Sequence, residues 1–256
     1  MSVGRKLHYT LRLASAMCFI GHGAFGIITK PIWCNYFAVL GVGHDLAYQL
    51  MPIVGSIDIL LGLSLLVYPV RAVFAWLVVW GFITASLRPV SGEPFAELIE
   101  RAGNFGAPLA MLLLSGKGGW LKRINPDMTV QPRVKHCLQI AGFLLLLGHG
   151  WLNLLDKKAL IAQYTALGFA QPLEAARWVG LLEVLMAVSL LIRPIRPLLI
   201  ILFIWKVGSE LFYPHYEIFE WVERGGSYGV LLALIFIARV RRFAGSMRYP
   251  RQTETA

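Results

Sequence analysis

The sequence predicts an all-α integral membrane protein, a helical bundle with about eight transmembrane helices in two related halves. Apolar types make up 57% of its 256 residues and charged types only 15%, whereas soluble domains carry about 25% charged residues. Several segments approach the roughly 20 apolar residues that a helix needs to cross a bilayer. The chain also repeats its own motifs in the same order. A soluble enzyme is excluded, because one core cannot hide so much apolar surface.

Hydropathy and helix-breaking residues divide the chain into candidate spans. They cover residues 11–29, 52–69, 72–88, 104–116, 137–155, 178–192, 197–212 and 227–240. The fourth is short, and we expect it to begin nearer Ala102. Basic residues precede the first span but no small-residue cleavage motif follows it, so we interpret it as a retained span rather than a signal peptide.

The repeat covers most of the chain. Its matches pair Gly21-His22-Gly23 with Gly148-His149-Gly150, Lys30 with Lys157, VGSIDILLGLSLLVYPVR (54–71) with VGLLEVLMAVSLLIRPIR (179–196), and ELIERAGNFG (97–106) with EWVERGGSYG (220–229). The offset drifts only from 127 to 123 residues, which indicates a tandem duplication. The predicted units are a first repeat (1–117), a cytoplasmic linker (118–135), a second repeat (136–244) and a cytoplasmic tail (245–256).

Orientation follows from the even number of spans in each half and from the basic residues. Four spans per half insert both halves in the same direction, which predicts parallel repeats related by a pseudo-twofold axis along the membrane normal. Sixteen of the 24 Lys and Arg residues fall on the side that holds both termini, so we expect both termini in the cytoplasm of a bacterial plasma (inner) membrane. These residues flank spans and form no single patch, and no nucleic-acid partner is predicted.

The connections on the other side are rich in aromatic residues. The segments 31–50, 90–103 and 213–226 mix Trp, Tyr and Phe with charged residues. Short amphipathic helices of this kind lie at the membrane interface. We therefore expect short interfacial helices that cover the outer ends of the spans.

Ionisable residues inside spans cost about 2.5–3.5 kcal/mol on insertion scales and mark candidate sites. They are His22, Asp58, Arg88, His149, Glu183, Lys206 and Glu210. At 1.5 Å per residue, the histidine and the acid of each half fall at nearly the same depth. Small residues recur on the acid face at i−3 and i+4, where another helix backbone can approach. We predict a histidine–carboxylate pair in each half, His22 with Asp58 and His149 with Glu183.

Several roles are open for these pairs. A purely structural link between helices, a proton relay and a ligand-binding site are all compatible with the residue types. A metal site would need His22, Asp58, His149 and Glu183 to meet at the pseudo-axis, and haem would need His22 and His149 as axial ligands. Lys206 and Glu210 have only Gly81 and Ala85 as counterparts in the first half. This asymmetry predicts a functional site that favours the second half.

The cysteines favour no redox relay through paired thiols. Cys18, Cys34 and Cys137 are three in number and contain no CxxC pair. An odd number excludes a complete disulfide framework. We expect three free thiols.

The segments FIGHGAFGIITK, GSIDILLGLSLLV, LLGHGWLNLLDK and GLLEVLMAVSLLIRPIRPL resemble the DoxX-like superfamily of four-helix membrane proteins, in two tandem copies. The shared features are His-Gly followed by Lys on the first helix and Gly-x-x-Glu on the second, where Asp58 departs from Glu. The resemblance implies a membrane-embedded partner of redox systems, as in thiosulfate:quinone oxidoreductase subunits, and it extends to relatives that act in cargo export.

Three functions follow as hypotheses, and whether the chain catalyses a reaction is left open. The first is an accessory subunit that binds quinone or another small amphipathic molecule and acts with membrane or soluble redox partner proteins. The second is a transport or cargo-binding protein that uses Glu183, Lys206 and Glu210 as a polar pathway. The third is a structural subunit of a larger membrane complex.

Overall fold

The computed structural model describes residues 1–211 and 218–238, and the described chain is all-helical, as predicted. Its helices are α1 (Val3–Ile27), α2 (Trp33–Val39), α3 (His44–Val67), α4 (Arg71–Val90), α5 (Ala96–Glu100), α6 (Ala102–Leu114), α7 (Pro132–Leu154), α8 (Lys158–Ala166), α9 (Pro172–Ile192), α10 (Arg196–Leu211), α11 (Ile218–Glu223) and α12 (Gly225–Ile237). The predicted tail (245–256) and the ends of the last two predicted spans lie outside the described residues.

Five of these helices, α1, α3, α4, α7 and α9, are long and apolar enough to cross a membrane. The chain therefore fits a multi-pass membrane protein. Each of the eight predicted segments overlaps a helix, but α6 and α12 have 13 residues each and α10 has 16. At 1.5 Å per residue, 13 residues reach only about 20 Å. The prediction of eight full spans is therefore not confirmed.

Helix starts are where the sequence prediction was least accurate. Pro52 lies inside α3, which begins at His44, although we had placed the start at this proline. Proline removes one backbone hydrogen bond and crowds the preceding turn, but membrane helices tolerate it where neighbouring groups satisfy the freed carbonyl. Likewise α1 begins at Val3, with the Ser2 hydroxyl accepting from the Arg5 backbone N–H at 3.3 Å. A hydropathy pattern does not detect a first helical turn made of polar residues. For the same reason α7 begins at Pro132, inside the predicted linker.

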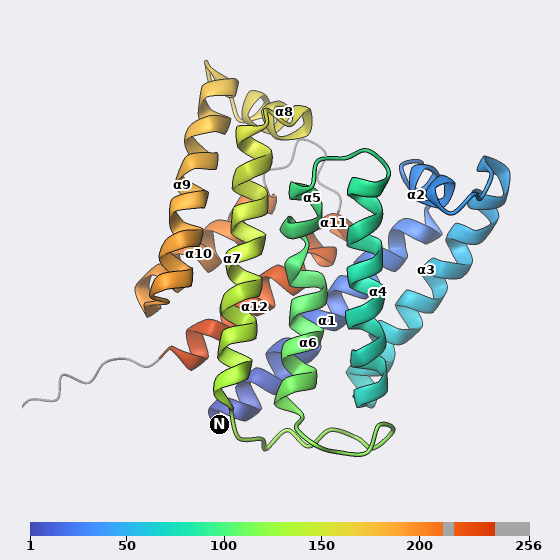
Figure 1. Cartoon of the computed structure of the whole chain (residues 1–256), viewed down its shortest axis with the longest axis vertical. Coiled ribbons are helices and arrows are strands. Elements are labelled where there is room, and N and C mark those ends of the chain that lie inside the picture. Colours follow the sequence, from blue (N-terminus) through green and yellow to red (C-terminus); the bar gives the residue numbers. More distant parts are fainter. Residues whose placement is uncertain (212–217, 239–256) are drawn as a thin grey trace, which may run out of the picture.

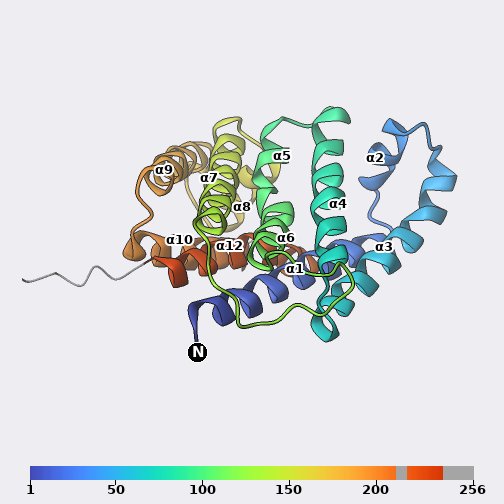
Figure 2. The same cartoon turned by 60° about the horizontal axis from the view of Figure 1, so that its bottom comes forward.

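The two histidine-bearing helices form the centre of the bundle. In their most apolar windows 61% of α1 and 56% of α7 is buried, against 22–28% for α3, α4 and α9. Figures 1 and 2 show α4, α6 and α7 side by side; α1 and α12 cross behind them in Figure 1 and lie lower in the turned view of Figure 2. The peripheral helices direct large apolar side chains outward, such as Leu60, Trp178 and Ile204. Lipid is the solvent that such surfaces require.

The first helix of each half packs against helices of both halves. Helix α1 contacts α3 of its own half and α11 and α12 of the other half. In the same way, α7 contacts α9 of its own half and α5 and α6 of the other. The buried apolar core runs through these contacts, from Leu7 and Phe19 in α1 to Leu145 in α7 and Leu231 in α12. The halves are therefore interlocked.

The Gly-His-Gly motifs create these close approaches. A side chain on Gly21 would meet the backbone of Glu223 in α11, and one on Gly148 would meet the backbone of Glu100 in α5. The glycines after the histidines face the other way: Gly23 lies against Gly55 in α3, and Gly150 lies against Gly180 in α9. Small residues let helix backbones approach closely in membranes. Each motif therefore holds one helix between two neighbours.

The connections show where the expectation of interfacial helices failed. Helix α5, within the segment 90–103, is buried: Ala96, Glu97 and Glu100 are each no more than 3% exposed. The reason is the close approach of α5 to Gly148 of α7. Helices α2 and α8 lie at the end of the bundle opposite the N-terminus in Figure 1. The N-terminus, the linker after α6 and the end of α12 lie toward the other end.

Replacing Gly148 by Ala tests the interlocked packing. We expect Gly148→Ala to destabilise the bundle by about 1–3 kcal/mol, because the added methyl group meets α5 backbone that cannot move aside. The matched control is Gly208→Ala on α10, where a Cβ would have nothing within 4 Å. The measurement is the thermal unfolding midpoint in detergent. Equal midpoints for the two variants would contradict the packing.

Candidate functional site

Both predicted histidine–carboxylate pairs are present. His22 Nδ1 in α1 lies 2.8 Å from Asp58 Oδ2 in α3, and His149 Nδ1 in α7 lies 2.6 Å from Glu183 Oε2 in α9. Both acids are buried, at 1% and 0% exposure. A buried carboxylate needs hydrogen-bond donors, and an imidazole N–H supplies one here. The pairs therefore connect α1 to α3 and α7 to α9.

The second pair is enclosed by further polar side chains. Trp205 Nε1 donates to the other oxygen of Glu183 at 2.9 Å. Asn153 Nδ2 lies 3.4 Å from Glu183 Oε2, and Tyr164 from α8 donates its hydroxyl to Asn153 at 3.2 Å. The sequence argument missed these three partners, although Trp205 was visible as the counterpart of Trp80. A buried network in which both oxygens of Glu183 have hydrogen-bond partners suits a structural link.

The first pair opens onto a cavity. The His22 side chain is 16% exposed, and its ring lies 4.7 Å from the ring of Trp33 between centroids, tilted by 33°. Because Nδ1 is engaged by Asp58, Nε2 is the ring nitrogen left for a ligand. This nitrogen accepts a hydrogen bond in the neutral imidazole and donates one in the imidazolium. His22 can therefore exchange a proton with a molecule in the cavity.

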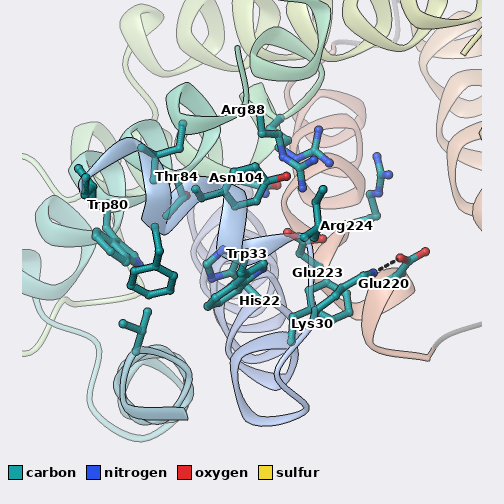
Figure 3. A pocket seen from close by; sticks show the side chains of 18 residues that line it. His22, Lys30, Trp33, Trp80, Thr84, Arg88, Asn104, Glu220, Glu223 and Arg224 are labelled. Carbon is teal, nitrogen blue, oxygen red and sulfur yellow. Dashed lines mark hydrogen bonds and ion pairs between the residues drawn. The ribbon is translucent and has the colours of Figure 1, made fainter. Parts of the chain in front are cut away.

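The cavity has a volume of about 130 Å³ and lies where α1, α2, α4 and α6 meet α11. Its lining is aromatic on one side and charged on the other, as Figure 3 shows. The aromatic residues are Phe25, Trp33, Tyr36, Phe37 and Trp80, and the charged ones are Lys30, Arg88, Arg101, Glu220, Glu223 and Arg224. Both halves of the chain contribute to it. Such a combination accepts a flat molecule with polar groups at one end.

Beyond the cavity the charged groups continue as one buried network. Arg101 Nη1 lies 2.6 Å from Glu97 and 3.0 Å from Glu100, and Arg224 pairs with Glu100 and, at 3.5 Å, with Glu210. Lys206 Nζ completes the chain 2.7 Å from Glu210. Arg101 and Arg224 are the residues at which α5 gives way to α6 and α11 to α12. The network therefore joins the two helix interruptions.

Two further ion pairs cross between the halves. Lys30 Nζ lies 2.6 Å from Glu220 Oε1, and Lys157 pairs with Glu97. Lys30 and Lys157 are repeat counterparts at an offset of 127, and Glu97 and Glu220 at an offset of 123. Each lysine after a Gly-His-Gly motif thus reaches the interrupted helix of the other half.

Tyr36 and Arg88 form the rim on the α2 side. The Tyr36 hydroxyl donates to Glu93 Oε1 at 2.6 Å, and Arg88 Nη1 lies 3.1 Å from Glu93 Oε2 and 3.5 Å from Glu97. Burial raises the pKa of Tyr36 well above its ordinary value, and the Glu93 carboxylate adds to this while Arg88 opposes it. Tyr36 therefore stays a neutral phenol at physiological pH.

The position of the cavity differs from the expectation of a site in the second half. His22 and Arg88 line it, whereas His149, Glu183, Lys206 and Glu210 do not. In the second half the His149 side chain is only 6% exposed, and Asn153 lies beside its ring. Arg101 and Arg224, which do line the cavity, were not singled out beforehand. The sequence feature that could have identified them is the Glu-Arg dipeptide that recurs in ELIERAGNFG and EWVERGGSYG.

The alternative metal and haem sites are not assembled by the described residues. No group of three or more His, Cys, Asp or Glu residues that could hold a metal occurs within 1–211 and 218–238. His22, Asp58, His149 and Glu183 separate into two pairs because each histidine engages the acid of its own half. Of the two histidines considered as haem ligands, His22 lines the cavity and His149 does not, so they do not form a pair of axial ligands there. Cys18, Cys34 and Cys137 are free thiols.

Comparison of the chain with protein-family models, with curated proteins and with solved structures found no match.

Removing the charge of Glu183 tests the closed second pair. We expect Glu183→Gln to destabilise the fold by about 1–3 kcal/mol, because the buried carboxylate that contacts His149 Nδ1 and accepts from Trp205 is lost. Glu174→Gln on the same helix is the matched control, since Glu174 is exposed and its loss should cost under about 0.5 kcal/mol. Thermal unfolding in detergent measures both. A Glu183 variant that melts with the control would show that the pair contributes nothing to stability.

Proposed function

We propose that this chain is a DoxX-like protein of the bacterial plasma membrane that binds a quinone or a similar small amphipathic molecule, as an accessory subunit of a membrane redox system. One observation carries the proposal: the cavity combines the His22–Asp58 pair, flat aromatic walls and a cluster of guanidinium groups. The resemblance of both halves to the DoxX-like superfamily supports the redox context.

We further propose that the chain is a tandem duplication whose two parallel four-helix repeats exchange their interrupted helices. The paired contacts support this. Gly21 approaches Glu223 as Gly148 approaches Glu100, and Lys30 pairs with Glu220 as Lys157 pairs with Glu97. Sequence counterparts thus make the same contacts across the bundle. The cavity then lies between repeats, a usual position for ligand sites.

The size of the cavity suits a single ring. A designed cavity of about 150 Å³ in another protein binds benzene, and this one measures about 130 Å³. Trp33 and Trp80 provide flat surfaces against which a ring can lie (Figure 3). An apolar tail attached to the ring would have to extend past the apolar lining residues Ile32, Leu40 and Val54.

The polar lining suits oxygen atoms on such a ring. The side chains of Thr84, Asn104 and Arg88 line the same space, and each can donate to a carbonyl oxygen. A bound quinone would supply two-electron, two-proton chemistry. His22 would hold or release a proton at Nε2, and Asp58 would stabilise the imidazolium that forms. An electron donor would be a partner protein, membrane-bound or soluble.

A transport function is the second candidate, and the interrupted helices favour it. Two short helix pairs, α5–α6 and α11–α12, break at Arg101 and Arg224 in corresponding positions of the halves. Transporters place substrate sites at such discontinuities. The buried chain from Arg101 through Arg224 and Glu210 to Lys206 would then be the polar pathway. A purely structural subunit would not need the cavity.

The His22→Gln variant tests quinone binding. We expect purified protein in detergent to bind a short-chain quinone in an equilibrium titration, and His22→Gln to weaken binding about tenfold through loss of one hydrogen bond to the ligand. His44→Gln is the matched control, because His44 is an exposed histidine on α3 that does not line the cavity.

Equal affinities for the two histidine variants, or no quinone binding by the native protein, would contradict the proposal. Proton-dependent uptake in reconstituted vesicles that is lost in Glu210→Gln, without any quinone binding, would instead support transport. A fixed protein partner that co-purifies with the native chain and with both histidine variants, in the absence of either activity, would support the structural role.

A further inference from the structure

We propose a second binding site, for an anionic phospholipid, at the end of the bundle that carries the N-terminus. The site is a surface-open cavity of about 770 Å³ between the start of α7, the α9–α10 connection and the end of α12. It lies apart from the aromatic cavity and shares no lining residue with it. The proposal is independent of the quinone function.

Three basic side chains line this cavity and have no ion-pair partner among the described residues. Lys135 of α7, Arg193 of the α9–α10 connection and Arg196 of α10 line it, and in the described part of the chain none forms an ion pair or a side-chain hydrogen bond. The 16-residue helix α10 begins at Arg196, so its positive dipole end adds to the same rim. Unpaired guanidinium groups are well suited to a phosphate, which they can bind through two hydrogen bonds each.

The floor of the cavity is apolar. Ile192, Ile200, Leu234 and Ile237 line it, and Ile192 and Ile200 are 78% and 41% exposed. Cationic rims above apolar gaps between transmembrane helices bind lipid head groups on the cytoplasmic side. The basic residues predict that this end is cytoplasmic. A phosphate on the rim and an acyl chain over the floor would satisfy both surfaces.

The corresponding place in the first half is closed by the linker. Arg71, the counterpart of Arg196, donates to Ser115 Oγ at 3.2 Å and lies over the ring of Trp120. Val70 is bridged to Arg123 and only 8% exposed, whereas its counterpart Ile195 is 46% exposed. The first half therefore covers Arg71 and Val70 with its own chain. In the second half, Arg193, Arg196 and the apolar lining residues are accessible to an external molecule.

Native mass spectrometry of the full-length protein tests the site. We expect it to bind phosphatidylglycerol more tightly than phosphatidylcholine with the same acyl chains. The double variant Arg193→Gln/Arg196→Gln should lose affinity for phosphatidylglycerol about 30-fold, as expected for two phosphate-binding cations. Lys117→Gln/Lys122→Gln removes the same charge from exposed residues of the α6–α7 connection and should leave binding unchanged.

Several outcomes would overturn the proposal. They are equal binding of the two lipids, equal loss in both double variants, and displacement of phosphatidylglycerol by an equal concentration of glycerol phosphate, which would make the ligand a soluble phosphate. Photo-crosslinking from Ile200→p-benzoylphenylalanine identifies the occupant. A cross-link to lipid supports the proposal, while cross-links to residues 239–256 or to a second copy of the chain would assign the cavity to a protein segment.

Discussion

The close approach of α1 and α7 to the interrupted helices is the constraint on which the rest of the structure depends. Gly21 and Gly148 have no side chains, so α11 can contact the backbone of α1 and α5 can contact the backbone of α7. Once the backbones are in contact, Glu100 and Glu223 lie in the interior. Buried carboxylates in a low-dielectric interior require cationic partners. Arg101 and Arg224 meet this requirement for Glu100, and the ion-pair network follows from that need.

The same histidine–acid pair has two environments in one chain. Beside His149, Asn153 donates to the His149 backbone carbonyl, and Trp205 donates to Glu183. Around His22 the position equivalent to Asn153 is Gly26, at the offset of 127, and the imidazole faces a cavity with Trp33 beside it. The buried His149–Glu183 pair links two helices, whereas the His22–Asp58 pair places an imidazole beside a cavity.

The charge distribution separates two kinds of cation. Those near the centre, such as Arg101 and Lys206, are paired with glutamates, because an unpaired charge there would be costly. Those at the end that carries the N-terminus include Arg193 and Arg196, which have no side-chain partner in the described ranges. The first kind holds the helices together. The second kind is exposed on the surface of the molecule.

The sequence by itself determined the helical class, the membrane environment and both histidine–acid pairs. Hydropathy and the spacing of small residues act locally along one or two helices, and they predict which faces meet. It did not determine that α5 is buried, that the site opens beside His22, or that Arg101 and Arg224 join the halves. These features depend on which helix of the other half occupies each groove. That choice is made by packing between segments more than 100 residues apart, which no local pattern encodes.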